Sequence, residues 1–286
     1  MTVAIRQIGV VGAGTMGSGI AQVFAQRSYG VLLFDAAPAQ LQRALSLIDK
    51  NLGKELEKGR IDAKQRDLAM TNVQTCREIR ELAKANLIVE AVSENLEVKK
   101  EVFRSLDAVS SEGTILASNT SSISITELAA VTQRPGKVIG MHFMNPVPIM
   151  KLVEIIRGIK TSTETVGSIM SLVQSIDKVA VEVNDAPGFV ANRVLMPMIN
   201  EAIFCVHDGV GSAEAVDAVM KLGMNHPMGP LTLADLIGLD VCLDIMETLY
   251  NGFSDSKYRP CPLLRKMVAA GLLGRKSGQG FYEYSR

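Results

Sequence analysis

One stretch of the chain, GMHFMNPVPIMKLVEII at residues 140–156, holds two side chains that could perform acid–base chemistry. His142 ends one strand-like run, and Glu154 stands alone inside the next apolar run. Histidine titrates near neutrality, so it suits a general acid or base. A carboxylate on its second ring nitrogen would hold one tautomer and stabilise the imidazolium. Because a glutamate buried without a partner is costly, and the spacing of 12 residues lets the two meet, we predict a catalytic pair.

Each of these residues also has a purely structural interpretation. Taken alone, His142 is more often a hydrogen-bonded histidine at a strand end. Glu154 could point to solvent, because strand side chains alternate between faces. Asn119 and Ser121 in SNTSS are likewise more often turn residues than catalytic ones.

A glycine-rich turn near the N-terminus indicates a dinucleotide cofactor. GVVGAGTMG places Gly12, Gly14 and Gly17 between a strand-like run and a helical pattern. Such glycines permit a tight turn and a close approach of backbone N–H groups to a pyrophosphate at the helix N-terminus. The second strand ends in Asp35, 18 residues after Gly17, where a carboxylate accepts the adenosine ribose hydroxyls. Asp35 would repel a 2′-phosphate and no Arg or Lys follows in the next five residues, so NAD is favoured over NADP.

Composition excludes several other classes of protein. The 30 basic and 30 acidic residues cancel, which leaves no basic field for nucleic acid or a membrane surface. The 4 cysteines are scattered without metal-ligand spacing, no Cys/His group suggests a metal, and the thiols fit a reducing compartment. No signal peptide precedes the first strand, and no apolar run approaches the ~20 residues of a membrane span. We therefore expect a soluble, cytoplasmic protein.

The elements that must position these residues fall into two groups. Short apolar runs alternate with helical patterns in residues 1–186, which is typical of βαβ units and a doubly wound, Rossmann-type α/β sheet. A charged helical insert at about 39–71 interrupts them and could form a hairpin. Residues 187–286 show helical periodicity without a convincing strand, which predicts an all-α second domain. The predicted strands are 8–12, 31–34, 86–92, 114–118, 137–143, 151–156 and 178–183.

Motifs along the whole chain, in the same order, resemble the L-3-hydroxyacyl-CoA dehydrogenase family, and most of all its short, stand-alone 3-hydroxybutyryl-CoA dehydrogenases. Beside the glycine-rich turn they are VEAVSENLEVKKEVF, SNTSS, GMHFMNPVPIMKLVE, DAPGFVANR, HPMGPLTLADLIGLD and GRKSGQGFYEY. The resemblance implies NAD-dependent interconversion of an L-3-hydroxyacyl-CoA and its 3-ketoacyl-CoA in fatty acid metabolism. Short chains are preferred, 3-hydroxybutyryl-CoA and acetoacetyl-CoA above all.

Carried over residue by residue, the resemblance also implies roles for individual side chains. His142 would be the acid/base with Glu154 as its partner, and Ser121 and Asn192 would contact the reacting oxygen or thioester. The active site is expected between the two domains. The residues expected near the dinucleotide are Gly12, Gly14, Thr15, Met16, Gly17, Asp35, Glu94, Lys99, Asn119, Ser121, Asn145 and Lys276.

The resemblance also has implications for the acyl-CoA and subunit contacts. The best match puts coenzyme A at Lys54 and Lys58 of the insert, although the nearby Glu55 and Glu57 fit a solvated helix face equally well. The resemblance implies a homodimer through the helical domain, whose Met- and Leu-rich stretches fit a subunit contact. Leu195 and Met196 are candidate contact residues.

Three alternatives remain open from the sequence. The β-hydroxyacid dehydrogenases share a similar nucleotide domain but use a catalytic lysine, and GSIMSLVQSIDK does not match their pattern. A 3-hydroxyadipyl-CoA dehydrogenase of aromatic catabolism would have the same chemistry. A non-catalytic dinucleotide-binding protein would not require His142, Glu154, Ser121 and Asn192 together.

Overall fold

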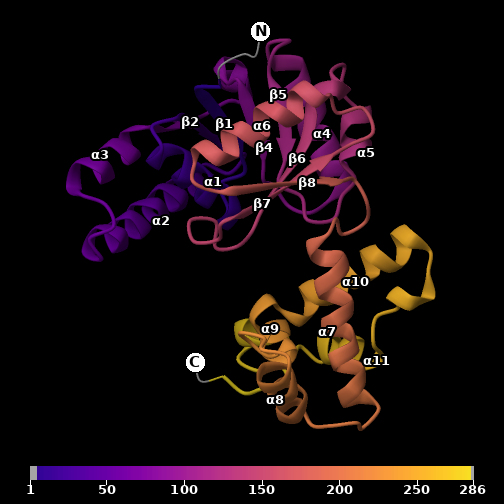
Figure 1. The fold of residues 1–286 in the computed structure, drawn as a ribbon. Helices are drawn as coiled ribbons and strands as arrows, with labels where there is room; N and C mark the ends of the chain where they lie inside the picture. Colours follow the sequence, from indigo (N-terminus) through magenta and orange to yellow (C-terminus); the bar gives the residue numbers. More distant parts are fainter. Residues whose placement is uncertain (1–4, 285–286) are drawn as a thin grey trace. The chain divides into compact units, whose positions relative to one another are not determined.

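The computed structural model describes residues 5–284. The chain divides into two compact units, one ending at Asp185 and the other beginning at Ala186 (Figure 1). Each unit is built from one continuous stretch of chain and has a hydrophobic core of its own.

The sheet of the first unit has eight strands in the order β3-β2-β1-β4-β5-β6-β7-β8. Strands β1 to β6 run parallel, β7 is antiparallel to β6, and β8 is parallel to β7. The strand order reverses between β1 and β4, as in doubly wound nucleotide-binding sheets. The strands are β1 (Gln7–Val11), β2 (Gly30–Phe34), β3 (Val73–Cys76), β4 (Leu87–Glu90), β5 (Ile115–Ser118), β6 (Val138–Phe143), β7 (Leu152–Arg157) and β8 (Val179–Asn184).

The predicted doubly wound sheet is confirmed, with one strand more than the sequence indicates. Each of the predicted strands is present, and no end is shifted by more than two residues. The additional strand is β3, whose sequence VQTC buries only its first and last residues. It lacks the continuous apolar run that marks the others. The predicted insert is the helical hairpin α2 (Pro38–Glu57) and α3 (Ala63–Thr71), at one edge of the unit (Figure 1).

Helices cover both faces of this sheet. On one face, α1 (Thr15–Gln26) and α6 (Thr163–Ser175) share a core with Leu87 and Val89 of β4. Ile88, between those two, points to the opposite face because strand side chains alternate. The helices α4 (Leu96–Val109) and α5 (Ile125–Ala130) lie on that opposite face. The result is a three-layer α/β/α unit.

The loop between β6 and β7 is tied to the helical layer. Val147 is buried against α1, where a Cβ atom on Gly19 would lie 2.8 Å from the Val147 Cβ. Lys178 is only 8 % exposed, and its ammonium group donates to the carbonyl oxygens of Val147 and Met150, each at 2.7 Å. Burial lowers the pKa of Lys178. These contacts hold the chain immediately after His142 in one conformation.

The second unit is helical, as predicted, and its described part has only isolated β-bridges near the C-terminus. Met196, expected at a subunit contact, is 2 % exposed and belongs to this unit's core, so that prediction is wrong. Helical periodicity identifies an apolar face but cannot tell what covers it. The helices are α7 (Ala191–His207), α8 (Ala213–Gly223), α9 (Pro230–Ile237), α10 (Leu239–Phe253) and α11 (Pro262–Ala269).

A buried carboxylate holds the C-terminal segment of this unit in place. Asp235 of α9 is 1 % exposed and accepts hydrogen bonds from the backbone N–H groups of Phe281 and Tyr282. It also accepts one from the Tyr284 hydroxyl. A Cβ atom on Gly280 would lie 2.0 Å from an Asp235 oxygen, so the segment can approach only with glycine there. The motif GRKSGQGFYEY is therefore anchored to α9.

Candidate active site

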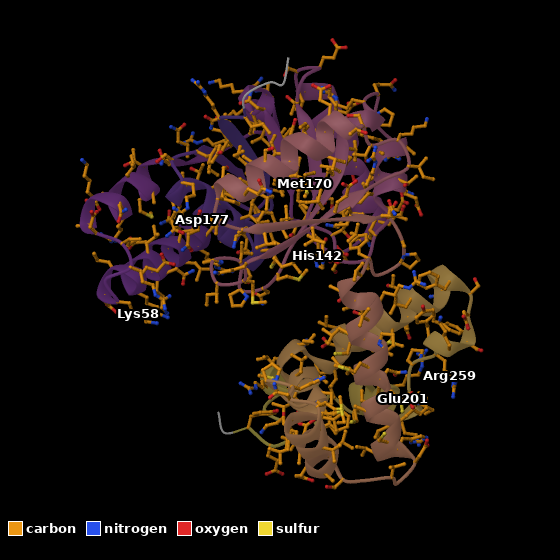
Figure 2. The ribbon with its side chains drawn as sticks, viewed as in Figure 1. Lys58, His142, Met170, Asp177, Glu201 and Arg259 are labelled. Carbon is orange, nitrogen blue, oxygen red and sulfur yellow. The ribbon has the colours of Figure 1, made fainter. Side chains whose placement is uncertain are left out.

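His142 and Glu154 meet because of the antiparallel pairing of β6 with β7. The two residues are direct cross-strand partners, so their side chains project from the same face of the sheet. The His142 Nδ1 atom lies 2.8 Å from the Glu154 Oε2 atom. The two residues are 8 % and 2 % exposed, so this contact is shielded from water. His142 lies on the sheet of the first unit in Figure 2.

This arrangement determines which ring nitrogen can react. An ionised carboxylate only accepts hydrogen bonds, so Nδ1 carries the proton of this contact. Nε2 is then the ring nitrogen that can act as a general base, and Glu154 stabilises the imidazolium that forms when Nε2 takes a proton. The pair is therefore suited to remove a proton from a hydroxyl group and to return it.

The glycine-rich turn fits a pyrophosphate. Gly12 has a φ of +100°, and a Cβ atom on it would lie 2.5 Å from the carbonyl oxygen of Ala91. A Cβ atom on Gly17 would lie 1.7 Å from the carbonyl oxygen of Gly12. A Cβ atom on Gly14 would meet nothing within 4 Å. The outer two glycines are thus required by packing, whereas Gly14 leaves open the space that a phosphate needs beside the backbone.

The start of α1 completes this cradle. The N-cap residue of α1 is Gly14, which offers no side-chain cap. Thr15 and Met16 form the first turn of the helix, where backbone N–H groups and the helix dipole favour an anion. The predicted dinucleotide residues of the turn are therefore brought together at one helix N-terminus.

Asp35 supports the same turn from the end of β2. Its Oδ2 atom accepts a hydrogen bond from the Ala13 N–H at 2.7 Å, and its Oδ1 atom accepts one from the Ala37 N–H at 2.8 Å. Each carboxylate oxygen keeps a further lone pair, so the side chain can still accept a ribose hydroxyl.

Glu94 organises the turn that carries Ser121. Its Oε1 atom accepts hydrogen bonds from the Thr120 hydroxyl at 2.6 Å and from the Ser121 N–H at 2.9 Å. The Ser121 and Ser122 hydroxyls donate to the same oxygen at 3.2 and 3.0 Å. Burial alone would raise the pKa of Glu94, but Lys99 and these donors hold its pKa below the ordinary value. Glu94 is therefore a carboxylate at neutral pH.

Asn119 links this turn to the strand that carries His142. Its Oδ1 atom accepts the backbone N–H of Phe143 at 2.9 Å, one residue after His142. The Asn119 amide nitrogen remains as a donor. Asn145, in the loop after β6, is exposed. The predicted cofactor and catalytic residues of the first unit therefore come from the ends of adjacent strands.

Lys99 lies deeper than its predicted place near the dinucleotide suggests. Its side chain is 1 % exposed, and its ammonium lies 2.7 Å from Glu90 and 3.4 Å from Glu94. Glu90, Ser118 and Thr120 belong to this cluster but are not among the residues predicted from the sequence. A sequence signal for Glu90 exists, because Glu90 interrupts the apolar run LIVEAV as Glu154 interrupts LVEII.

The lysines predicted for coenzyme A lie on the surface of the hairpin. Lys54 and Lys58 are exposed, and Figure 2 shows Lys58 near the end of α2. A hollow of about 310 Å³ beside the hairpin is lined by other basic side chains, among them Arg60, Lys151 and Lys178. Lys54 and Lys58 are thus accessible to a ligand, but they do not line this hollow.

Asn192 and Lys276 belong to the second unit. Asn192, in the first turn of α7, is 8 % exposed, and its backbone N–H donates to the Gly188 carbonyl. Gly188 has a φ of +71°, and a Cβ atom there would lie 2.6 Å from Leu249, which explains the glycine of DAPGFVANR. Lys276 forms an ion pair with Asp240.

Metal and membrane sites are not found in the part of the chain that the structure describes. Among residues 5–284 there is no group of three or more His, Cys, Asp and Glu side chains that could hold a metal ion. Within the same residues, none of the helices combines the length and the apolar character needed to cross a bilayer.

Two family models together match the two units. Residues 7–186 match "3-hydroxyacyl-CoA dehydrogenase, NAD binding domain", and residues 188–284 match "3-hydroxyacyl-CoA dehydrogenase, C-terminal domain". The first match agrees with the glycine cradle and Asp35 at the carboxyl ends of β1 and β2.

Individual proteins are similar over the whole chain. The 3-hydroxybutyryl-CoA dehydrogenase of Clostridioides difficile is 51 % identical over 280 residues, which cover 98 % of this chain and 100 % of the relative. The 3-hydroxyadipyl-CoA dehydrogenase of Escherichia coli K12 is 39 % identical over 99 % of this chain and 60 % of its own length. The crystal structure of (S)-3-hydroxybutyryl-CoA dehydrogenase from Ralstonia eutropha superimposes with a TM-score of 0.97 at 46 % identity, covering 99 % and 100 % of the two chains. The chain therefore belongs to the 3-hydroxyacyl-CoA dehydrogenase family, and it is an NAD-dependent dehydrogenase of that family.

Proposed function

We propose that the chain interconverts (S)-3-hydroxybutyryl-CoA and acetoacetyl-CoA. The observation that carries the proposal is the shielded contact of 2.8 Å between His142 and Glu154 in a chain of this family. Oxidation of a secondary alcohol requires a base for the hydroxyl proton, and this pair supplies one. The higher identity to the 3-hydroxybutyryl-CoA enzyme, 51 % against 39 % for the 3-hydroxyadipyl-CoA enzyme, favours the shorter substrate.

Each residue of the proposed site has a separate role in the reaction. Bound NAD supplies the group that accepts hydride from C3 of the substrate. His142 removes the hydroxyl proton at Nε2 during oxidation and returns it to the oxygen during reduction. Glu154 holds the imidazole ring and balances its charge. Glu94 keeps the Ser121 turn in place, and the Ser121 hydroxyl contacts the reacting oxygen or the thioester.

Further roles are proposed for residues that the geometry leaves available. Lys54 and Lys58 contact the phosphates of coenzyme A. The roles given above for Asn192 and Lys276 in the second unit remain predictions. The protein acts in the cytoplasm, which fits four cysteines that are all unpaired thiols.

A direct assay tests the proposed function. NADH absorbance is followed after addition of acetoacetyl-CoA, and turnover is compared with that of 3-oxoadipyl-CoA. We expect the larger kcat/KM for acetoacetyl-CoA. A larger value for 3-oxoadipyl-CoA would favour the aromatic-catabolism enzyme, and absence of turnover with both would indicate a non-catalytic dinucleotide-binding protein.

Cofactor choice should depend on Asp35. Asp35→Ala removes a charge-assisted hydrogen bond worth about 1.5–3 kcal/mol, so NADH binding should weaken roughly ten- to a hundredfold. Asp35→Asn keeps an acceptor for the Ala13 N–H while removing the charge that repels a 2′-phosphate. It should therefore narrow the gap between NADH and NADPH without loosening the turn. The kcat/KM values for both cofactors measure this, and equal values in the unmodified enzyme would contradict the assignment.

We propose that the second unit forms the contact of a homodimer. Asp217 is the only buried side chain of α8, while Val219 and Leu222 on the same helix are 61 % and 86 % exposed. Burying such exposed apolar side chains against another surface is favourable in free energy. Twofold pairing of identical chains is the commonest way in which this happens.

Light scattering at micromolar concentration tests the dimer. We expect a mass of about twice 30.8 kDa for the unmodified protein and a mass near 30.8 kDa for Leu222→Asp, because the charge cannot be buried in an apolar contact. Ile159→Asp is the matched control, since Ile159 of the first unit is also 86 % exposed. A single-chain mass for the unmodified protein would refute the dimer. A mass for Leu222→Asp equal to that of the unmodified dimer would show that α8 is not part of the subunit contact.

A further inference from the structure

A buried ionic cluster lies at the point where the strand order of the sheet reverses. Glu90 ends β4 and is the register partner of Val11 on β1 and of Ser118 on β5. The crevice beyond these carboxyl ends is where doubly wound sheets bind their ligands. Glu90 is 0 % exposed and Lys99 is 1 % exposed, so a full ion pair lies beneath that crevice.

Glu90 is held from three directions. Its Oε1 atom accepts the Lys99 ammonium and the Val92 N–H, both at 2.7 Å. Its Oε2 atom accepts the Ser118 hydroxyl at 2.6 Å. The carboxylate thus bridges β4, α4 and β5, and it has little freedom to move.

Lys99 connects this fixed group to a more exposed one. Its ammonium also lies 3.4 Å from the Oε2 atom of Glu94, whose side chain is 38 % exposed. The other oxygen of Glu94 gathers the Thr120, Ser121 and Ser122 donors described above. Negative, positive and negative charges therefore alternate from the core of the sheet to the turn that carries Ser121.

A buried ion pair is weak evidence for stability, because desolvation of the two charges can exceed their attraction. Well-packed apolar side chains would stabilise the same interior at least as well. A conformational role accounts better for a charged pair at this position, because Lys99 can direct the Glu94 carboxylate only if Glu90 holds Lys99 in place.

We propose that Glu90, acting through Lys99, is a positioning residue that orients Glu94 and its turn for the cofactor. The proposal rests on the proposed function insofar as it takes Glu94 to lie near the dinucleotide. Lys99 then acts from behind Glu94, in keeping with its burial.

The test measures NADH binding directly. The chain contains no tryptophan, so the rise in NADH fluorescence on binding has no tryptophan background. We expect Glu90→Gln and Lys99→Met each to raise the Kd for NADH about tenfold, a size ordinary for coupled neighbours. The double variant should bind no more weakly than Lys99→Met alone, because Glu90 acts through Lys99. In steady-state assays, the KM for NADH should rise more than the KM for acetoacetyl-CoA.

A second ion pair of the same unit, largely shielded from water, provides the matched control. Arg134 and Asp107 lie 2.6 Å apart with side chains 13 % and 10 % exposed. Asp107→Asn should lower the melting temperature and leave NADH binding unchanged. Glu90→Gln and Lys99→Met variants that lower the melting temperature in the same way, with an unchanged Kd, would show a merely structural pair and overturn the proposal. Additive effects in the double variant would also overturn it.

Two further variants keep the outcomes distinct. Ser118→Ala shortens one side chain that holds Glu90 and should raise the Kd several-fold with little loss of stability. Ser118→Ala therefore tests the proposal if the Glu90 and Lys99 variants do not fold, and an unchanged Kd for NADH would then refute the proposal.

Glu94→Gln reports on Glu94 itself. If Glu94→Gln weakens NADH binding while the Glu90 and Lys99 variants do not, only the proposed action of Glu90 through Lys99 is refuted. If Glu94→Gln has no effect on NADH binding, the cofactor role of Glu94 is refuted, and the positioning role of Glu90 is refuted with it.

Discussion

His142→Ala should lower kcat by about 10²–10⁴-fold, the usual contribution of a general acid–base group. The variant loses the group proposed to take the hydroxyl proton, while the glycine cradle and Asp35, the proposed dinucleotide site, are unchanged. NADH affinity should therefore stay within about twofold of the unmodified value, as for independent sites. Steady-state turnover of acetoacetyl-CoA and NADH fluorescence measure the two quantities.

Another histidine and a small-molecule base serve as controls for this variant. His207→Ala, at the end of α7, should leave kcat unchanged. Added imidazole should restore part of the activity of His142→Ala, because it can occupy the space of the missing ring. A His142→Ala enzyme that keeps more than about a tenth of the unmodified kcat would exceed what loss of such a group allows and would remove His142 from the mechanism.

Glu154→Gln should lower kcat by about 10²-fold or more, because a neutral amide cannot balance the charge of the imidazolium. Glutamine has nearly the same shape, so the cross-strand contact with His142 can form and the fold should persist. The amide can also donate to Nδ1, which would favour the wrong tautomer. Turnover of acetoacetyl-CoA and the melting temperature separate the chemical effect from the structural one.

Glu182→Gln is the matched control on the neighbouring strand. Glu182 lies on β8 and pairs with Arg157 at the surface, away from the histidine. Its substitution should leave kcat within about twofold. If Glu154→Gln were as active as Glu182→Gln, the buried carboxylate would have a packing role and His142 would act without it.

Much of the first unit could be predicted from the sequence because its signals are local. Three glycines at fixed spacing followed by Asp35 define a turn whose backbone conformation few other residues allow. Continuous apolar runs mark the buried strands, and helical periodicity marks the insert and the second unit. β3 is not predicted from the sequence, because this short edge strand has two exposed residues and therefore no continuous apolar run.

The sequence predicts His142 and Glu154 as a pair, but it does not determine the strand register on which their contact depends. A chain separation of 12 residues permits many strand registers, and a shift of one residue would put the two side chains on opposite faces. Only the observed pairing of β6 with β7 makes them direct neighbours.

Burial is what the tertiary structure alone decided. The sequence shows a glutamate in LIVE and a lysine on α4, and it cannot tell that both lose their water and face each other beneath the crevice. For the same reason it cannot tell that Met196 lies inside the second unit while Leu222 stays exposed. Local patterns record which faces of a helix or strand are apolar. Which element covers each face depends on contacts between distant segments, and these exist only once the chain has folded.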